Sequence, residues 1–140
     1  MTSTGVEVVE REGQTYAIIL RASATSSEKY NFLTDSKSPL QLGMNFYTRG
    51  ETIKAHYHLP RHIECEQVQE FVLIGAGRAR LTLYDAADQS PFTTLPLETG
   101  DMVLLLFGGH GFEIDEDTKI VEIKQGPYDG KTKDKVVFGT

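Results

Sequence analysis

The stretch GETIKAHYH, residues 50–58, holds two histidines, His56 and His58, separated by a single tyrosine. Side chains of a β-strand alternate between two faces with a period of two, so both imidazoles are expected on the same face. A β-scaffold can offer two imidazoles to one metal ion in this way. Later predicted strands contain Glu70 and His110, the candidates for a third and a fourth ligand.

Length and composition predict one compact domain. The chain has 140 residues, of which 39% are hydrophobic and 24% charged, as is ordinary for a globular protein. A net charge of −6 argues against nucleic acid as a partner. No apolar run approaches the ~20 residues that span a membrane, and no secretion signal is visible. Because Cys65 is the only cysteine, it cannot form an internal disulfide. We therefore expect a cytoplasmic protein without membrane contact.

The hydrophobic pattern predicts an all-β fold. Short apolar or alternating runs recur with turn signals between them, and no convincing helical period is present. This spacing is typical of a sandwich or a barrel. The expected strands are residues 15–20, 42–47, 54–58, 69–74, 78–84, 92–97, 102–107, 111–114 and 119–124.

Glycines stand at fixed distances from the candidate ligands. Gly50 precedes His56 by six residues, six residues separate Glu70 from Gly77, and Gly100 opens a segment that ends at His110. This spacing resembles the two motifs of the cupin superfamily, and the matching stretch covers about half of the chain.

The resemblance implies a double-stranded β-helix, the jelly-roll barrel of cupins, with a metal inside. The motif positions imply that His56, His58, Glu70 and His110 bind one divalent transition metal: zinc, nickel, iron or manganese. Residues 1–140 would form a single cupin domain. Within it, residues 1–41 would add strands or an arm, residues 42–125 would form the barrel core, and residues 126–140 would form a surface tail.

The chain departs from the cupin pattern at two places. The eleven residues between His58 and Glu70 are more than the motif usually has, and they offer rival ligands, among them His62 and Cys65. Leu106 stands where proline is usual. The insertion and the segments 108–113 and 121–128 resemble those of small cupins encoded near surface-polysaccharide and sugar-nucleotide genes.

Six further residues are candidates for catalysis or substrate binding. The proposed proton-transfer groups are Glu122, Lys124 and Tyr128, and the proposed substrate-binding groups are Phe112, Arg78 and His62. Each has a simpler interpretation. Glu122 and Lys124 share one strand face that points either into solvent or into the barrel, Phe112 can be plain core, and Arg78, His62 and Tyr128 can be surface residues.

Two classes of function remain open. The first is a metal-dependent enzyme, an isomerase, epimerase or oxygenase, acting on a small polar metabolite such as a sugar or sugar nucleotide. The alternative is a non-catalytic cupin module that binds a small molecule as a sensor or accessory protein. We also expect a homodimer, from the family habit of pairing barrels and from the apolar strand residues Tyr16, Ile18 and Leu20.

Overall fold

The computed structural model describes residues 3–139 and is all-β, as predicted, with one short helix. Every strand pairing is antiparallel. The elements are β1 (Ser3–Arg11), β2 (Gln14–Ser26), β3 (Tyr30–Phe32), β4 (Gly43–Asn45), β5 (Glu70–Ala76), β6 (Arg78–Tyr84), β7 (Pro91–Glu98), β8 (Met102–Leu105), β9 (Gly109–Ile114), β10 (Lys119–Lys124) and α1 (Lys131–Asp134).

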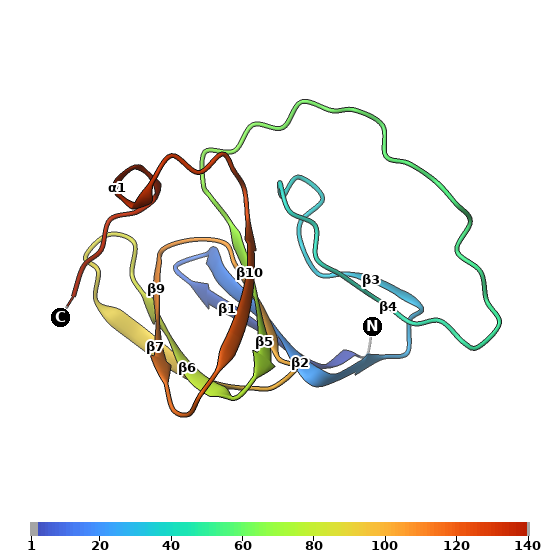
Figure 1. Ribbon diagram of the computed structural model, residues 1–140, viewed down its shortest axis with the longest axis horizontal. Coiled ribbons are helices and arrows are strands. Elements are labelled where there is room, and N and C mark those ends of the chain that lie inside the picture. The colour runs from blue at the N-terminus through green and yellow to red at the C-terminus, as the bar shows by residue number, and fades with distance from the viewer. Residues whose placement is uncertain (1–2, 140) are drawn as a thin grey trace.

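Two sheets face each other, and a small hairpin lies apart from them (Figure 1). The larger sheet has the order β1-β2-β8-β5-β10, and the smaller has the order β7-β6-β9. The hairpin consists of β3 and β4. Within residues 3–139 the sheets share no strand, so they are not closed into a barrel.

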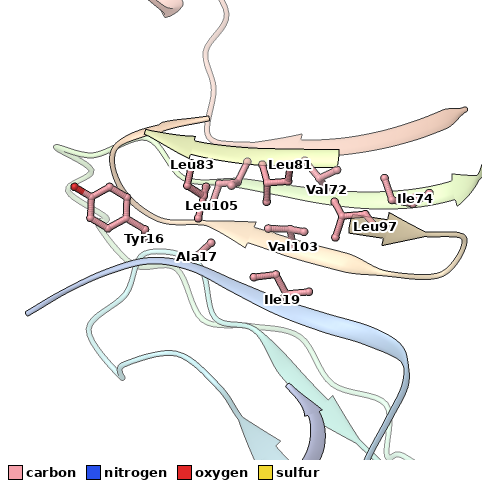
Figure 2. Close-up of a cluster of buried hydrophobic side chains, with 10 residues drawn as sticks. All are labelled: Tyr16, Ala17, Ile19, Val72, Ile74, Leu81, Leu83, Leu97, Val103 and Leu105. Atoms are coloured by element: carbon pink, nitrogen blue, oxygen red, sulfur yellow. The ribbon is translucent and has the colours of Figure 1, made fainter. Parts of the chain in front are cut away.

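An apolar layer fills the space between the two sheets (Figure 2). It is built from alternate residues of β2, β5 and β8 on one side and of β6 and β7 on the other, as the period of two requires. Burial of each large aliphatic side chain contributes about 1.5–3 kcal/mol to folding. The buried members are Tyr16, Ala17, Ile19, Val72, Ile74, Leu81, Leu83, Leu97, Val103 and Leu105.

Residues 14–20 belong to an inner strand of the larger sheet. β2 pairs with β1 on one side and with β8 on the other, so it is not an addition to the outside of the fold. The side chains of Tyr16, Ile18 and Leu20 are at most 4% exposed within the single chain. These residues therefore offer no apolar surface to a second copy, and a homodimer stays a prediction without this support.

The sequence located most strands but missed or misassigned others. The bounds of β6 and β10 agree with the expected ones, and the strands expected at residues 69–74, 92–97 and 102–107 are present with small shifts. β1 and β3 lie within residues 1–41, where additional strands were expected without defined bounds, and α1 was not expected. The prediction of a strand at residues 54–58 was wrong, because residues 46–69 contain no helix or strand in the described chain.

The segment 46–69 forms a wide loop that runs away from the two sheets (Figure 1). It is anchored at its end by Gln69, which is 8% exposed. The Oε1 atom of Gln69 accepts hydrogen bonds from Ser38 Oγ and Leu40 N, both at 3.2 Å. The backbone N–H of Gln69 donates to Gln125 Oε1 at 2.7 Å. These bonds join the end of the loop to β10 and to the chain between β3 and β4.

Asp101 fixes the turn between β7 and β8 against β2. The turn itself is as expected, with Gly100 at a positive φ of 90° and the N–H of Asp101 donating to Glu98 O at 2.9 Å. The Asp101 carboxylate is nearly buried and accepts hydrogen bonds from the N–H groups of Ala22 and Glu98, both at 2.9 Å. It also accepts one from Arg21 Nη1 at 3.0 Å.

Replacement of Asp101 with Asn should lower the free energy of unfolding by about 2 kcal/mol, because it removes a charged acceptor from three buried or half-buried donors. The measurement is urea unfolding at neutral pH. Asp129→Asn, at an exposed position, is the control and should change stability little. Equal effects of the two substitutions would show that the Asp101 contacts do not stabilise the fold.

Candidate functional site

Glu70 and His110 come from different sheets and meet at one end of the space between them. On β9, His110 pairs with Leu83, and on β5, Glu70 pairs with Leu105. Directly paired residues of neighbouring strands point to the same face, and Leu83 and Leu105 both point into the core. His110 and Glu70 therefore point inward as well. His110 Nε2 lies 3.4 Å from Glu70 Oε2.

The carboxylate of Glu70 is held in its charged form. The neighbouring imidazole of His110 is the main cause that keeps the pKa of Glu70 below its usual range, and the ammonium groups of Lys124 and Lys135 act in the same direction. Partial burial opposes them by raising the pKa. Glu70 is therefore a carboxylate at neutral pH, the form in which it can bind a metal ion.

Two charged residues of β10 join this pair. Lys124 pairs with Glu70, and Glu122 pairs with Val72, a buried core residue. By the same register argument, Glu122 and Lys124 lie on the face of β10 that borders the cavity, where Glu122 is still exposed at the open end, and Val121 and Ile123 lie on the outer face. The strand thus presents its polar face inward at this end of the molecule, which is the second of the two orientations that the sequence left open.

These residues line a cavity of about 620 Å³, within the usual size range of small-molecule sites. Phe112 lies on its wall, two residues after His110 on the same face of β9. The ring centroids of His110 and Phe112 are 6.2 Å apart. Tyr84 and Phe107 add further aromatic surface. The cavity therefore combines an apolar wall with a small set of charged groups.

The C-terminal segment covers one side of this cavity. Asp134, in α1, forms an ion pair with Lys124, with Nζ and Oδ2 2.8 Å apart. The ring of Phe138 packs edge-on against Tyr84, with centroids 5.2 Å apart, and lies close to the backbone of Gly109. The expected surface tail is thus part of the cavity wall. Its residues Lys131, Asp134, Lys135 and Phe138 were missed, because nothing in the sequence of the tail marks them.

His56 and His58 lie apart from Glu70 and His110. Both are exposed on the segment 46–69, and their ring centroids are 5.4 Å apart. His56 Nδ1 is 2.7 Å from the carbonyl oxygen of Lys54. The part of the chain that the structure describes contains no group of three or more His, Cys, Asp or Glu side chains placed to hold a metal ion. The donor chemistry of the four residues fits a transition metal, but only Glu70 and His110 are brought together.

Three other candidates lie outside the cavity. His62 is exposed on the segment 46–69, with Nε2 3.9 Å from Glu64 Oε1. Arg78 forms an exposed ion pair with Glu116 at 3.4 Å. The ring of Tyr128 is 63% exposed and lies 5.3 Å from Lys124 Nζ. All three side chains therefore lie at the surface, in agreement with the interpretation of them as surface residues.

No family model, curated protein or solved structure matches this chain. Among residues 3–139, no helix has the length and apolar character needed to cross a membrane. The interpretation of the cavity depends on its own residues.

The contact between Gly109 and Phe138 can be tested with two alanine substitutions on the same strand. A Cβ at Gly109 would lie 2.6 Å from Phe138 Cζ, whereas one at Gly111 would lie 3.6 Å from the nearest atom of Tyr84. We expect Gly109→Ala to displace the C-terminal segment and Gly111→Ala to leave it in place. Amide hydrogen exchange of residues 131–139 should rise in the first variant alone. No difference between the variants would contradict the packing of Phe138.

Proposed function

We propose that this chain is a metal-binding, cupin-like protein whose site is built around Glu70 and His110 and takes a small polar metabolite. The observation that carries the proposal is the meeting of an ionised carboxylate and an imidazole, from opposite sheets, at the wall of a cavity of ligand size. Carboxylate and imidazole are both ligands of transition metals. The sequence motifs supply His56 and His58 as the remaining ligands.

The proposal requires the segment 46–69 to close over the sheets. In the described part of the chain, β9 and β10 are each paired on one side only, so each leaves an open edge. Residues 54–58 carry the period-two pattern of a strand, and an open edge can accept a further strand. Pairing of residues 54–58 with β9 would add a strand beside His110 and bring the sheets closer to a jelly-roll barrel.

Chain length and local polarity permit this closure. The eleven residues between His58 and Glu70 can reach about 36 Å when extended, enough to let residues 54–58 move without disturbing β5. The Nε2 of Gln125, at the end of β10, is buried and has no acceptor among residues 3–139. A buried donor without a partner is costly, and a carbonyl group of the closed segment would supply one.

When bound, the metal would polarise a carbonyl or hydroxyl oxygen of the metabolite or lower the pKa of bound water. The chain itself provides the other functions. Glu122 faces the cavity and is placed to accept or return a proton, while Phe112 packs against the body of the metabolite. The resemblance to small cupins encoded near sugar-nucleotide genes makes a sugar or sugar nucleotide the proposed substrate class, with isomerisation or epimerisation as the proposed chemistry.

A non-catalytic binding module is the second candidate. It is favoured by the ion pair between Lys124 and Asp134, because this pair engages one of the proposed proton-transfer residues and leaves Glu122 as the one on β10 that is not held in an ion pair within the described residues. A binding module needs the metal and the cavity but no proton-transfer residue. Turnover of a sugar substrate that depends on Glu122 would distinguish the enzyme from the module.

We expect the double variant His56→Ala, His58→Ala to retain about one tenth of the zinc that the unchanged protein retains, or less, because half of the proposed ligands are lost. The protein is stripped with a chelator, reloaded with zinc, desalted and analysed for metal. Tyr57→Ala is the matched control, since Tyr57 lies between the histidines and alternates to the other face. Unchanged zinc content in the double variant would refute the metal site.

Closure of the loop makes a separate prediction. Zinc should slow amide hydrogen exchange in residues 54–58, because these N–H groups become hydrogen bonded to β9 when the segment joins the sheet. Residues 86–90, in the turn after β6, serve as an internal reference and should not respond. Zinc binding without protection of residues 54–58 would mean that the histidines bind metal without forming a strand.

A further inference from the structure

Three lysines converge on the side of the cavity that the C-terminal segment covers. Lys124 reaches it from β10, and Lys131 and Lys135 reach it from α1 and the residue that follows. Lys131 and Lys135 are four residues apart, so they lie on the same side of a helical turn. Lys133, between them, does not line the cavity. Lys124, Lys131 and Lys135 therefore border the same cavity.

One of these lysines is already paired with an acidic residue of the same segment. The carboxylate of Asp134 lies 2.8 Å from Lys124 Nζ, and its side chain is 14% exposed. Among residues 3–139, no ion pair with a carboxylate is found for Lys131 or Lys135. Lys131 and Lys135 are thus not held in an ion pair in the described chain, although Lys135 acts at longer range on Glu70, and both ammonium groups are available to an added anion.

We propose that the cavity binds a small organic anion whose carboxylate or phosphate group takes the position of the Asp134 carboxylate among Lys124, Lys131 and Lys135. Lysine ammonium groups bind such oxyanions as point charges, and three of them suit a phosphate or carboxylate group. The inference deepens the proposed function by specifying that the substrate is negatively charged. For the sugar part of the ligand it rests on that proposed function.

The cavity also accommodates the rest of such a molecule. Tyr84, Phe112 and Phe138 provide an aromatic wall, which suits the apolar face of a sugar ring or another ring. Glu70 and His110 line the same cavity, with Glu70 within electrostatic range of Lys124 and Lys135, and offer an acceptor and an imidazole to hydroxyl groups. The ligand would thus be held through its charged group by the lysines and through its hydroxyl groups by Glu70 and His110.

Competition between the ligand and Asp134 gives the inference a distinctive signature. Removal of the internal carboxylate should strengthen binding, because the ligand no longer has to displace it from Lys124. Asp134→Asn should therefore lower the dissociation constant by about fivefold, and the double variant Lys131→Met, Lys135→Met should raise it by about fivefold. Lys133→Met removes the same charge from the same helix and should have little effect.

Three hexose probes test the chemistry: glucose 1-phosphate, glucuronate and glucose. Binding is followed by the shift in melting temperature and by calorimetry, up to about 10 mM ligand. We expect glucose 1-phosphate or glucuronate to bind and glucose not to bind, and the tighter of the two charged sugars identifies phosphate or carboxylate as the preferred group. Equal binding of all three, or binding of neither charged sugar, would overturn the inference.

Each titration is run on chelator-treated protein and on zinc-loaded protein. Charged-sugar binding to both forms, in a chain that fails to retain zinc, would leave the anion site standing and remove the metal. Zinc retention without a charged-sugar response would support the metal site and overturn the anion site. A loss of binding in Lys133→Met as large as that in the double lysine variant would also overturn the inference, because the effect would then come from net charge alone.

Discussion

The packing of the two sheets against each other determines every other feature of the molecule. Leu83 and Leu105 are buried in the layer between the sheets, and their strand neighbours His110 and Glu70 must face the same way. A shift of one residue in either pairing would expose the leucine and turn the polar side chain outward. The free energy of apolar burial therefore also fixes the position of the polar pair, and no separate interaction is needed to hold it there.

The apolar layer ends where the charged residues begin, and this boundary has an energetic reason. Ionised side chains are costly in the interior unless they are paired or partly hydrated. Glu70 has His110 beside it, and Lys124 has Asp134. Both pairs sit at the open end of the sandwich, where their side chains are still 14–33% exposed. The fold therefore keeps charges close to apolar surface without burying them fully, a combination that suits a binding cavity.

Parts of this arrangement were predictable from the sequence. β6 alternates buried and less buried residues, so its bounds followed from the pattern alone. The contact between His110 and Glu70 joins two sheets, and the sequence placed these residues in two separate motifs. Residues 54–58 alternate only between polar and weakly apolar side chains, and such a segment becomes a strand only if an edge accepts it. The contribution of residues 131–139 was hidden for a different reason: its contacts join residues distant in sequence, such as Phe138 and Tyr84, and leave no periodic signal.

The outward apolar face of β10 bears on how this protein behaves when concentrated. Val121 and Ile123 are 40% and 58% exposed on a strand whose outer edge is unpaired within the described chain, and Ile114 near the end of β9 is 54% exposed. Unpaired edges with apolar side chains favour sheet-to-sheet association between molecules, which leads to aggregation. Whatever covers these strands, whether the chain's own loop or another protein, would act as protection for the polypeptide during synthesis and storage.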